Sequence, residues 1–276
     1  MRIDGNTELI AHIGWPTYSF KAPLIYNPYF EQAGINAMVT PMGCKREHFA
    51  EFLRNVFNLE NVRGALITMP HKVSVLSLLD VVSPAVRVAG ACNAVKRGAD
   101  GKLYGDMFDG EGFVRGVQRK GFEVSGKRAL VVGAGGVGSA IAASLAGAGV
   151  SELALFDLNA ASCDALASRI SANYPDVKIS KGSNDPSGFD LVVNATPLGM
   201  KEGDQLSIDV SRLDANTFVG EVVMTTEVTA FLAAAKARGC RTQIGTDMLY
   251  EQIPAYLEYF NLPSTTAEHL REVSLA

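Results

Sequence analysis

A short run of glycines constrains this chain more than any other feature of its sequence. Residues 129–138 read ALVVGAGGVG, an apolar stretch typical of a strand that leads directly into the pattern Gly-x-Gly-x-x-Gly. Gly133 permits a tight turn, Gly135 lets the backbone approach a pyrophosphate, and Gly138 allows the next helix to pack against the strand. The N-terminus of that helix offers free N–H groups to phosphate oxygens. The pattern predicts a dinucleotide site formed by Gly133, Ala134, Gly135, Gly136, Val137 and Gly138.

An acidic residue follows the glycine turn at the distance that ribose binding requires. The next apolar stretch, Leu153-Ala-Leu-Phe-Asp157, ends on a carboxylate, close to the roughly 20 residues expected after the first glycine. Such a carboxylate accepts hydrogen bonds from ribose hydroxyls and repels a 2′-phosphate. No arginine follows before Arg169, so the sequence predicts NAD in preference to NADP. A glycine turn beside an unrelated surface aspartate is disfavoured, because strand, helix and acid occur in the expected order.

The same glycine segment has a second interpretation as a membrane span. Residues 129–150 carry no charge, and about 20 apolar residues can cross a bilayer. The segment contains six glycines, however, and four of them lie between Gly133 and Gly138, where they would break a spanning helix. We therefore expect strand, turn and helix, and no membrane partner.

The overall composition indicates a globular protein that does not bind nucleic acid through its net charge. Of 276 residues, 47% are hydrophobic and 20% charged, and the net charge of −4 gives no footprint for nucleic acid. The first ten residues, MRIDGNTELI, lack the basic flank and apolar core of a signal peptide, so we expect a cytoplasmic protein. Cysteines and histidines, four of each, are scattered without a Cys-x-x-Cys pair, so we expect no metal site.

Strands and helices alternate along the chain. The expected strands are 9–14, 36–40, 64–69, 93–96, 102–104, 128–133, 152–156, 189–194, 218–222 and 241–244, and the expected helices are 22–33, 46–58, 73–79, 137–148, 160–171, 228–238, one that begins near 109, and those of the tail after 245. This alternation predicts an α/β fold with mainly parallel sheets covered on both faces. We expect two α/β domains, a substrate-binding domain over 1–106 and a Rossmann-type NAD-binding domain over 107–244. Helices over 245–276 are expected to return to the first domain.

Two charged residues follow strands of the predicted sheets, where α/β proteins place their ligands. Lys72 closes the segment Thr68-Met-Pro70-His-Lys72, and Asp109 lies just past the strand that ends near 104. A lysine can exchange a proton with an alcohol or ketone oxygen while a hydride moves to or from a nicotinamide, and an aspartate can orient that lysine. Judged by periodicity alone, each would more often be an ordinary solvated charge. His71 is expected at the surface.

The order of short motifs resembles the shikimate dehydrogenase family along nearly the whole chain. The matching motifs are Gly14-x-Pro16 with Pro23, Thr68-x-Pro70-x-Lys72, Gly90-Ala-Cys-Asn93, Asp109-Gly-x-Gly-Phe113, the glycine turn from Gly133, Asn194-Ala-Thr196-Pro-x-Gly199-Met200 and Gly245-x-x-Met248-Leu-x-x-Gln252. The resemblance implies that Lys72 and Asp109 are catalytic. It also implies that Thr68, Asn93 and Gln252 bind substrate and that Asn194, Thr196 and Gly245 belong to the cofactor site.

The chain departs from the family's pattern where the resemblance places the substrate. Two serines that hold the substrate carboxylate correspond here to Phe20 and Ala22, and an asparagine two residues before Thr68 corresponds to Leu66. An Asn-Thr pair corresponds to Met107-Phe108, and a tyrosine of the nucleotide domain corresponds to Met224. A buried carboxylate without partners costs several kcal/mol. The positions either drifted or accompany a changed substrate, and the desolvation argument favours the change unless Tyr18, Ser19 or Lys21 substitutes.

These observations together predict an NAD-dependent oxidoreductase that interconverts a cyclic alcohol and its ketone. It would be similar to shikimate and quinate dehydrogenases, with altered substrate specificity, and its partner would be a small cyclic hydroxy acid or polyol. Two alternatives stay open, an NADP-dependent biosynthetic shikimate dehydrogenase and a homologue that senses nucleotides without catalysis. We expect a monomer or a homodimer.

Overall fold

The computed structural model describes residues 3–275, and these residues divide into two compact units. Unit 1 contains the chain up to Val86, Gly90–Phe108 and the residues from Ile253 on. Unit 2 contains Arg87–Ala89 and Asp109–Gln252. The two-domain α/β architecture is therefore confirmed, and each unit is described by itself.

Unit 1 is built on a six-stranded sheet in the order β2-β1-β3-β5-β6-β4. The strands are β1 (Glu8–Gly14), β2 (Ala37–Gly43), β3 (Val62–Ile67), β4 (Val81–Val82), β5 (Ala94–Arg97) and β6 (Leu103–Asp106). β1 runs parallel to both β2 and β3, whereas β5 runs antiparallel to β3 and β6. The reversal follows from the connection between β5 and β6, because residues 98–102 are too few for a crossover. The short β4 is not visible in the sequence pattern.

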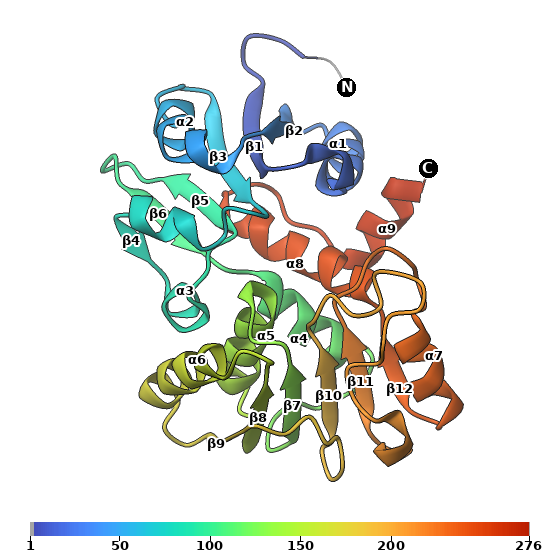
Figure 1. Ribbon diagram of the computed structural model, residues 1–276. Coiled ribbons are helices and arrows are strands. Elements are labelled where there is room, and N and C mark those ends of the chain that lie inside the picture. Colours follow the sequence, from blue (N-terminus) through green and yellow to red (C-terminus); the bar gives the residue numbers. More distant parts are fainter. Residues whose placement is uncertain (1–2, 276) are drawn as a thin grey trace. The chain divides into compact units, whose positions relative to one another are not determined.

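The helices of unit 1 differ most from the sequence pattern around residues 73–89. They are α1 (Ala22–Gln32), α2 (Phe49–Val56), α9 (Ala267–Leu275) and α3 (Pro84–Ala89), whose last three residues belong to unit 2, with 3-10 turns at Thr17–Ser19, Arg46–His48 and Ser74–Leu78. The helix expected over 73–79 is therefore only a short 3-10 turn. α3 was not predicted, although Ser83 caps it by accepting a hydrogen bond from the Val86 N–H. α9 lies beside α1 (Figure 1), so the end of the chain packs on the unit that contains its beginning.

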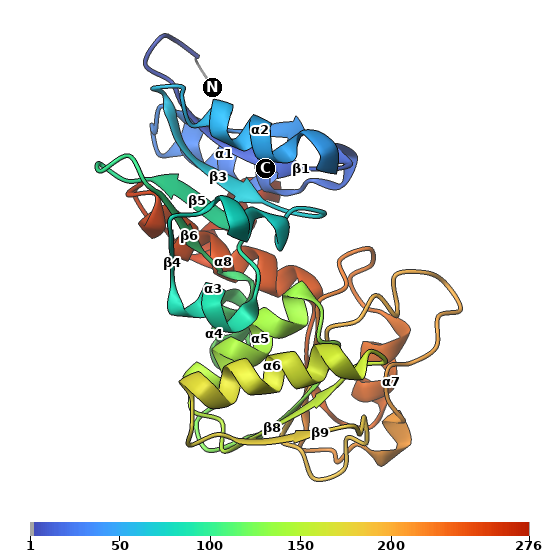
Figure 2. The same cartoon turned by 60° about the vertical axis from the view of Figure 1, so that its left-hand side comes forward.

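Unit 2 is a fully parallel six-stranded sheet in the order β12-β11-β10-β7-β8-β9. Its strands are β7 (Arg128–Val132), β8 (Glu152–Phe156), β9 (Lys178–Lys181), β10 (Leu191–Asn194), β11 (Phe218–Glu221) and β12 (Arg241–Gln243). Its helices are α4 (Asp109–Arg119), α5 (Gly136–Gly147), α6 (Ala160–Asn173), α7 (Ala230–Ala237) and the larger part of α8 (Gly245–Tyr259). Figure 2 shows α5 and α6 on one face of this sheet and α7 on the other.

Alternation along β7 explains why both faces of this sheet are covered. Ala129 and Val131 pack into the core beneath α4, α5 and α6, whereas Leu130 and Val132 pack into the core beneath α7. All four side chains are buried, as is typical of a parallel strand with helices on both sides. Among the described residues, no helix is both long and apolar enough to cross a membrane. The uncharged segment at 129–150 is strand, turn and α5, as predicted.

Candidate active site

The glycine turn between β7 and α5 has the backbone geometry that its sequence predicts. Gly133 has φ +108°, in the region that favours glycine, and a Cβ on Gly138 would collide with the carbonyl oxygen of Gly133. Gly135, by contrast, is exposed, and a Cβ built there meets no atom within 4 Å. The backbone is thus open at Gly135 and closely packed at Gly133 and Gly138. This is the surface that a pyrophosphate needs at the N-terminus of α5.

Asp157 lies directly after β8 and is hydrogen-bonded to the glycine turn. One carboxylate oxygen accepts from the N–H of Ala134 at 2.7 Å, and the other accepts from the N–H of Asn159 at 2.8 Å. Each carboxylate oxygen can accept a further hydrogen bond, so two hydroxyls could still be recognised. The next residue, Leu158, is 96% exposed and brings no positive charge. The geometry therefore fits a ribose with free hydroxyls.

A second loop of unit 2, after β10, is held in shape by its own polar side chains. Asn194 is buried, its oxygen accepts from the N–H and the hydroxyl of Thr196, and its amide donates to the carbonyl of Leu198. The Thr196 hydroxyl in turn accepts from the Leu198 N–H. These two residues therefore fix the path of the loop. Gly245 opens α8 against β11, where a Cβ would collide with the Val223 carbonyl.

The sequence analysis missed a buried carboxylate near that loop. Glu221 ends β11 with no exposed surface, and the Thr229 hydroxyl donates to it at 2.9 Å. Burial raises the pKa of this carboxyl to about 7, although the hydrogen bonds from Thr229 and Asn194 act in the opposite direction. A glutamate in an otherwise apolar strand, eight residues before a threonine, was the only available signal.

Unit 1 places Thr68 and Lys72 just past the carboxyl end of β3. The N–H of Thr68 bonds to the Ile13 carbonyl of β1, and the carbonyl of Lys72 accepts from the N–H of Cys92. The loop from 68 to 72 is thereby fixed at both ends. Asn93 is buried nearby, its side-chain oxygen accepting from the N–H of Phe108 and its carbonyl from the N–H of Ile67. Thr68 and Asn93, which were predicted to bind substrate, therefore lie at the same end of this sheet.

Unit 2 contains the two other residues that were predicted for substrate chemistry. Asp109 is the first residue of α4 and is buried. Gln252 is buried in α8, and its side-chain oxygen has no hydrogen-bond partner. α8 lies against Gly112 of α4, where a Cβ would come within 2.7 Å of the Gln252 Cβ. An unpartnered buried oxygen costs free energy, so Gln252 is suited to accept a hydrogen bond from a ligand.

The shikimate dehydrogenase substrate binding domain matches residues 13–95, and the ThiF family matches residues 117–183. A shikimate dehydrogenase (NADP(+)) of Paracoccus denitrificans is 33% identical over 98% of this chain and 97% of its own length. The chain belongs to the shikimate dehydrogenase family.

Solved structures of the same fold extend the match over both units. Shikimate 5-dehydrogenase from Listeria monocytogenes, in complex with shikimate and NAD, is 28% identical with a TM-score of 0.92 over 99% of this chain and 98% of its own. The 5-ketofructose reductase of Gluconobacter sp. strain CHM43 is 26% identical with a TM-score of 0.88 over 98% of both chains. As a member of this family, the protein is an oxidoreductase of the shikimate dehydrogenase type with a Rossmann-type nucleotide-binding unit.

Five of the positions at which the chain departs from the family's pattern lie in unit 1 and carry apolar side chains. Ala22, Leu66, Met107 and Phe108 are buried and Phe20 is half-buried. The three polar residues of the same loop, Tyr18, Ser19 and Lys21, are all exposed, Tyr18 to 90%. None of the three is buried with the altered positions.

Two histidines of unit 1 are buried, and the sequence analysis anticipated neither. His71 was expected at the surface, and this was wrong. It is fully buried, its ring stacks on Phe49 with centroids 3.9 Å apart, and its Nε2 lies 2.7 Å from the Cys44 carbonyl oxygen. His12 lies within β1 and stacks on Phe20 with centroids 4.1 Å apart. A single histidine inside a strand gives no sequence signal that separates a core position from a site.

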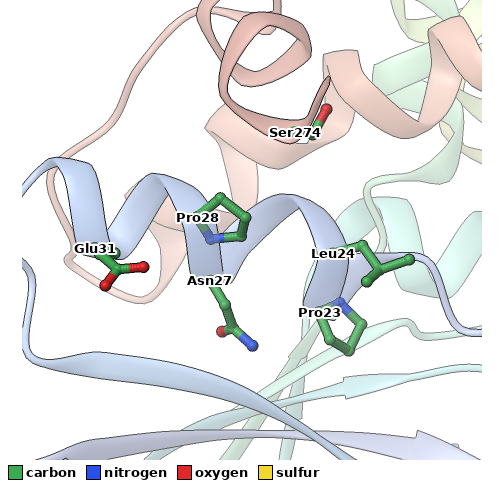
Figure 3. A pocket seen from close by; sticks show the side chains of 6 residues that line it. All are labelled: Pro23, Leu24, Asn27, Pro28, Glu31 and Ser274. Carbon is green, nitrogen blue, oxygen red and sulfur yellow. The ribbon is translucent and has the colours of Figure 1, made fainter. Parts of the chain in front are cut away.

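A shallow groove in unit 1 is separate from these residues. It has a volume of about 560 Å³ and is lined by Pro23, Leu24, Asn27, Pro28, Glu31 and Ser274, from α1 and α9 (Figure 3). None of the residues predicted for catalysis, substrate or cofactor lines this groove. A second hollow of about 340 Å³ in unit 2 is lined by residues 198–207, 225–226 and 228–231, from the loops after β10 and β11 and the start of α7.

Proposed function

We propose that this protein is an NAD-dependent oxidoreductase that interconverts a cyclic alcohol and its ketone, and that its substrate lacks the carboxylate of shikimate. Membership of the family supports the oxidoreductase chemistry. The proposed preference for NAD and the proposed change of substrate are not supported by family membership. They rest on this chain's own residues.

The single observation that carries the cofactor proposal is the position of Asp157. Its carboxylate is bonded to the Ala134 N–H of the glycine turn and is followed by an exposed leucine. A 2′-phosphate brought to this point would meet a negative charge without a compensating cation. The open backbone at Gly135 and the N-terminus of α5 fit the pyrophosphate of the same dinucleotide. The P. denitrificans relative is named for NADP, whereas the L. monocytogenes structure contains NAD.

Proton transfer is assigned to Lys72, with Asp109 as its acidic partner, as the family resemblance implies. When bound, the nicotinamide exchanges a hydride with the carbinol carbon. Lys72 then gives or takes the proton of the adjacent oxygen, which avoids an unstabilised alkoxide. Thr68, Asn93 and Gln252 position the remaining hydroxyls, and the unpartnered oxygen of Gln252 supports this role.

The apolar side chains at the altered positions of unit 1 support a substrate without a carboxylate. A carboxylate needs several hydrogen-bond donors when water is excluded, and Phe20, Ala22 and Leu66 offer none from their side chains. The Gluconobacter relative is named for 5-ketofructose, a sugar with carbonyl and hydroxyl groups only. Uncharged cyclic polyols are the candidate substrates.

A screen of cyclic alcohols with NAD and NADP, followed at the nicotinamide absorbance, tests this function. The panel contains shikimate, quinate and cyclohexane polyols without a carboxylate, each with the parent protein and with Lys72→Ala. We expect NAD-linked turnover of an uncharged member, and a fall in kcat of at least about a hundredfold in Lys72→Ala with nearly unchanged NAD affinity. NAD binding without turnover of any member would instead favour a nucleotide sensor.

A further inference from the structure

His12 is the one polar side chain of β1 that lies beside the altered substrate positions of unit 1. In the parallel register of β1 and β3, His12 is paired with Leu66, and paired residues of parallel strands project from the same face of a sheet. Its ring also stacks on Phe20, with centroids 4.1 Å apart and planes inclined by 27°. His12 therefore contacts or adjoins two positions at which this chain has lost a polar group.

The same face of the sheet leads to the residues predicted to act on substrate. Gly14 follows His12 by two residues, and a Cβ placed on it would meet the side chain of Thr68 and, at 3.0 Å, the ring of Phe20. Lys72 is close enough to His12 for its charge to act on the imidazole. His12 thus belongs to the same group of side chains as Phe20, Thr68 and Lys72.

His12 is also energetically unusual. Only 8% of the residue is exposed, and its Nδ1 is sealed from solvent without a hydrogen-bond partner. Burial, and then the charge of Lys72, lower the pKa of His12 to about 4, so the ring is neutral at physiological pH. A neutral ring carries one proton, and a sealed N–H without an acceptor is costlier than a sealed lone pair. The proton is therefore best placed on Nε2.

We propose that His12 is a substrate-binding residue, whose Nε2–H donates a hydrogen bond to an uncharged oxygen of the substrate, a hydroxyl or a carbonyl. This oxygen occupies the place of the carboxylate that serines hold in the family. One imidazole supplies one donor, which satisfies a hydroxyl but leaves a carboxylate largely unsolvated. The inference rests on the proposed function and adds the residue that sets its substrate class.

The burial of an unpartnered nitrogen also argues against a purely structural role. A histidine that served only packing would be replaced by phenylalanine at no loss, since the stacked ring would remain and the unpaired nitrogen would disappear. The Nδ1 of His71 is likewise buried without a partner, but its Nε2 is engaged by the Cys44 carbonyl oxygen, so His71 has no ring nitrogen left for a ligand. His71→Phe is therefore the matched control.

The test compares two analogues of shikimate, one with a hydroxymethyl and one with a methyl group in place of the carboxylate. Each is assayed with the parent, His12→Phe, His12→Gln and His71→Phe. We expect His12→Phe to lower kcat/KM for the hydroxymethyl analogue by about tenfold to a hundredfold, mainly through KM, and to change the methyl analogue by less than about twofold. His12→Gln should recover part of the loss. His71→Phe should affect both analogues equally, and the melting temperature of His12→Phe should match or exceed that of the parent.

Equal effects of His12→Phe on the two analogues, or no effect on either, would overturn the assignment. Calorimetric binding of the hydroxymethyl analogue to the protein with NAD separates this result from a failure of the proposed function. Binding that His12→Phe weakens, without turnover by the parent, would keep His12 as a binding residue and reject the dehydrogenase. Turnover that does not change in the His12 variants would keep the dehydrogenase and reject His12 as a binding residue. Absence of both binding and turnover would reject the dehydrogenase and the His12 assignment together.

Discussion

The two units of this protein differ in whether backbone or side chains form their candidate sites. In unit 2 the candidate cofactor site is mainly backbone: a left-handed glycine at 133, an open one at 135 and the N-terminus of α5. In unit 1 the candidate substrate site is mainly side chain, from Phe20 through Leu66 to Lys72. A site made of backbone tolerates few substitutions, whereas a site made of side chains can be rebuilt one residue at a time.

This difference explains why the glycine turn keeps the family's pattern while Phe20, Ala22 and Leu66 depart from it. A side chain at Gly138 would collide with the carbonyl oxygen of Gly133, so the turn could not form around one. Nothing comparable restricts Phe20, which is half-buried and could shrink to a smaller side chain. A dehydrogenase can thus keep its cofactor while it changes its substrate.

The largest effect is expected when the two serines of the family's carboxylate site are restored in unit 1. Phe20→Ser combined with Ala22→Ser should raise kcat/KM for shikimate by at least about a hundredfold, because two hydroxyl donors to a carboxylate are each worth about 1.5–3 kcal/mol. The measurement is steady-state kinetics with shikimate and with the hydroxymethyl analogue. Phe20→Ala with Ala22 retained is the control for cavity formation alone. An unchanged preference between the two substrates would place the carboxylate elsewhere.

Much of the fold was predictable because each unit has strong local signals. β8 was predicted at its observed limits, and β7, α5 and β11 within one residue, since their apolar runs end at glycine or at a charged residue. β5 and β6 were also located, but their antiparallel pairing depends on a five-residue connection rather than on strand composition. The Ser74–Leu78 turn shows the limit of the method, because its apolar residues resemble one turn of an α-helix.

The candidate sites were predictable to the extent that they are local in sequence. The glycine turn and Asp157 are such cases, and in the structure a hydrogen bond from the Ala134 N–H joins them. His12 and Glu221 were not found, because their significance comes from neighbours in other strands and loops, Leu66 for the first and Thr229 for the second. Periodicity identifies the face of a strand but not which residue lies opposite.

A smaller effect is expected when the comparison is tested from the cofactor side. Asp157→Ala should weaken NAD binding by about tenfold and narrow the preference for NAD over NADP, because a charged acceptor for ribose hydroxyls is lost. Titration of both nucleotides by fluorescence or calorimetry measures the ratio. Since Asp157 also accepts from Ala134, Asp157→Asn, which keeps one acceptor oxygen, controls for loosening of the turn. A ratio that stays constant in Asp157→Ala would remove this residue from the ribose site.

The smallest effect on activity, and the clearest on stability, concerns Glu221 in unit 2. The pKa of its carboxyl is raised from an ordinary 4.5 to about 7, chiefly by burial. Between these pH values the folded protein binds a proton that the unfolded chain has released. The stabilising contribution is therefore fully present below about pH 4.5, falls as the pH rises, and is lost above about pH 7.

Glu221→Gln should abolish this pH dependence, because the amide cannot release a proton and its oxygen still accepts from Thr229. The variant should gain about 3 kcal/mol in free energy of unfolding relative to the parent between pH 4.5 and pH 7.5, as a rise in the pKa of Glu221 from 4.5 to about 7 implies. Urea unfolding of both proteins at pH 4.5 and pH 7.5 measures the difference in free energy of unfolding. Titration of Glu221→Gln with NAD, as described for the Asp157 variants, serves as the functional control. A parallel decline in the two proteins would mean that the carboxyl is solvated in the folded state. The end of β11 at Glu221 would then tolerate side-chain changes as readily as the substrate positions of unit 1. The contrast between the two units would in that case be limited to the glycine turn.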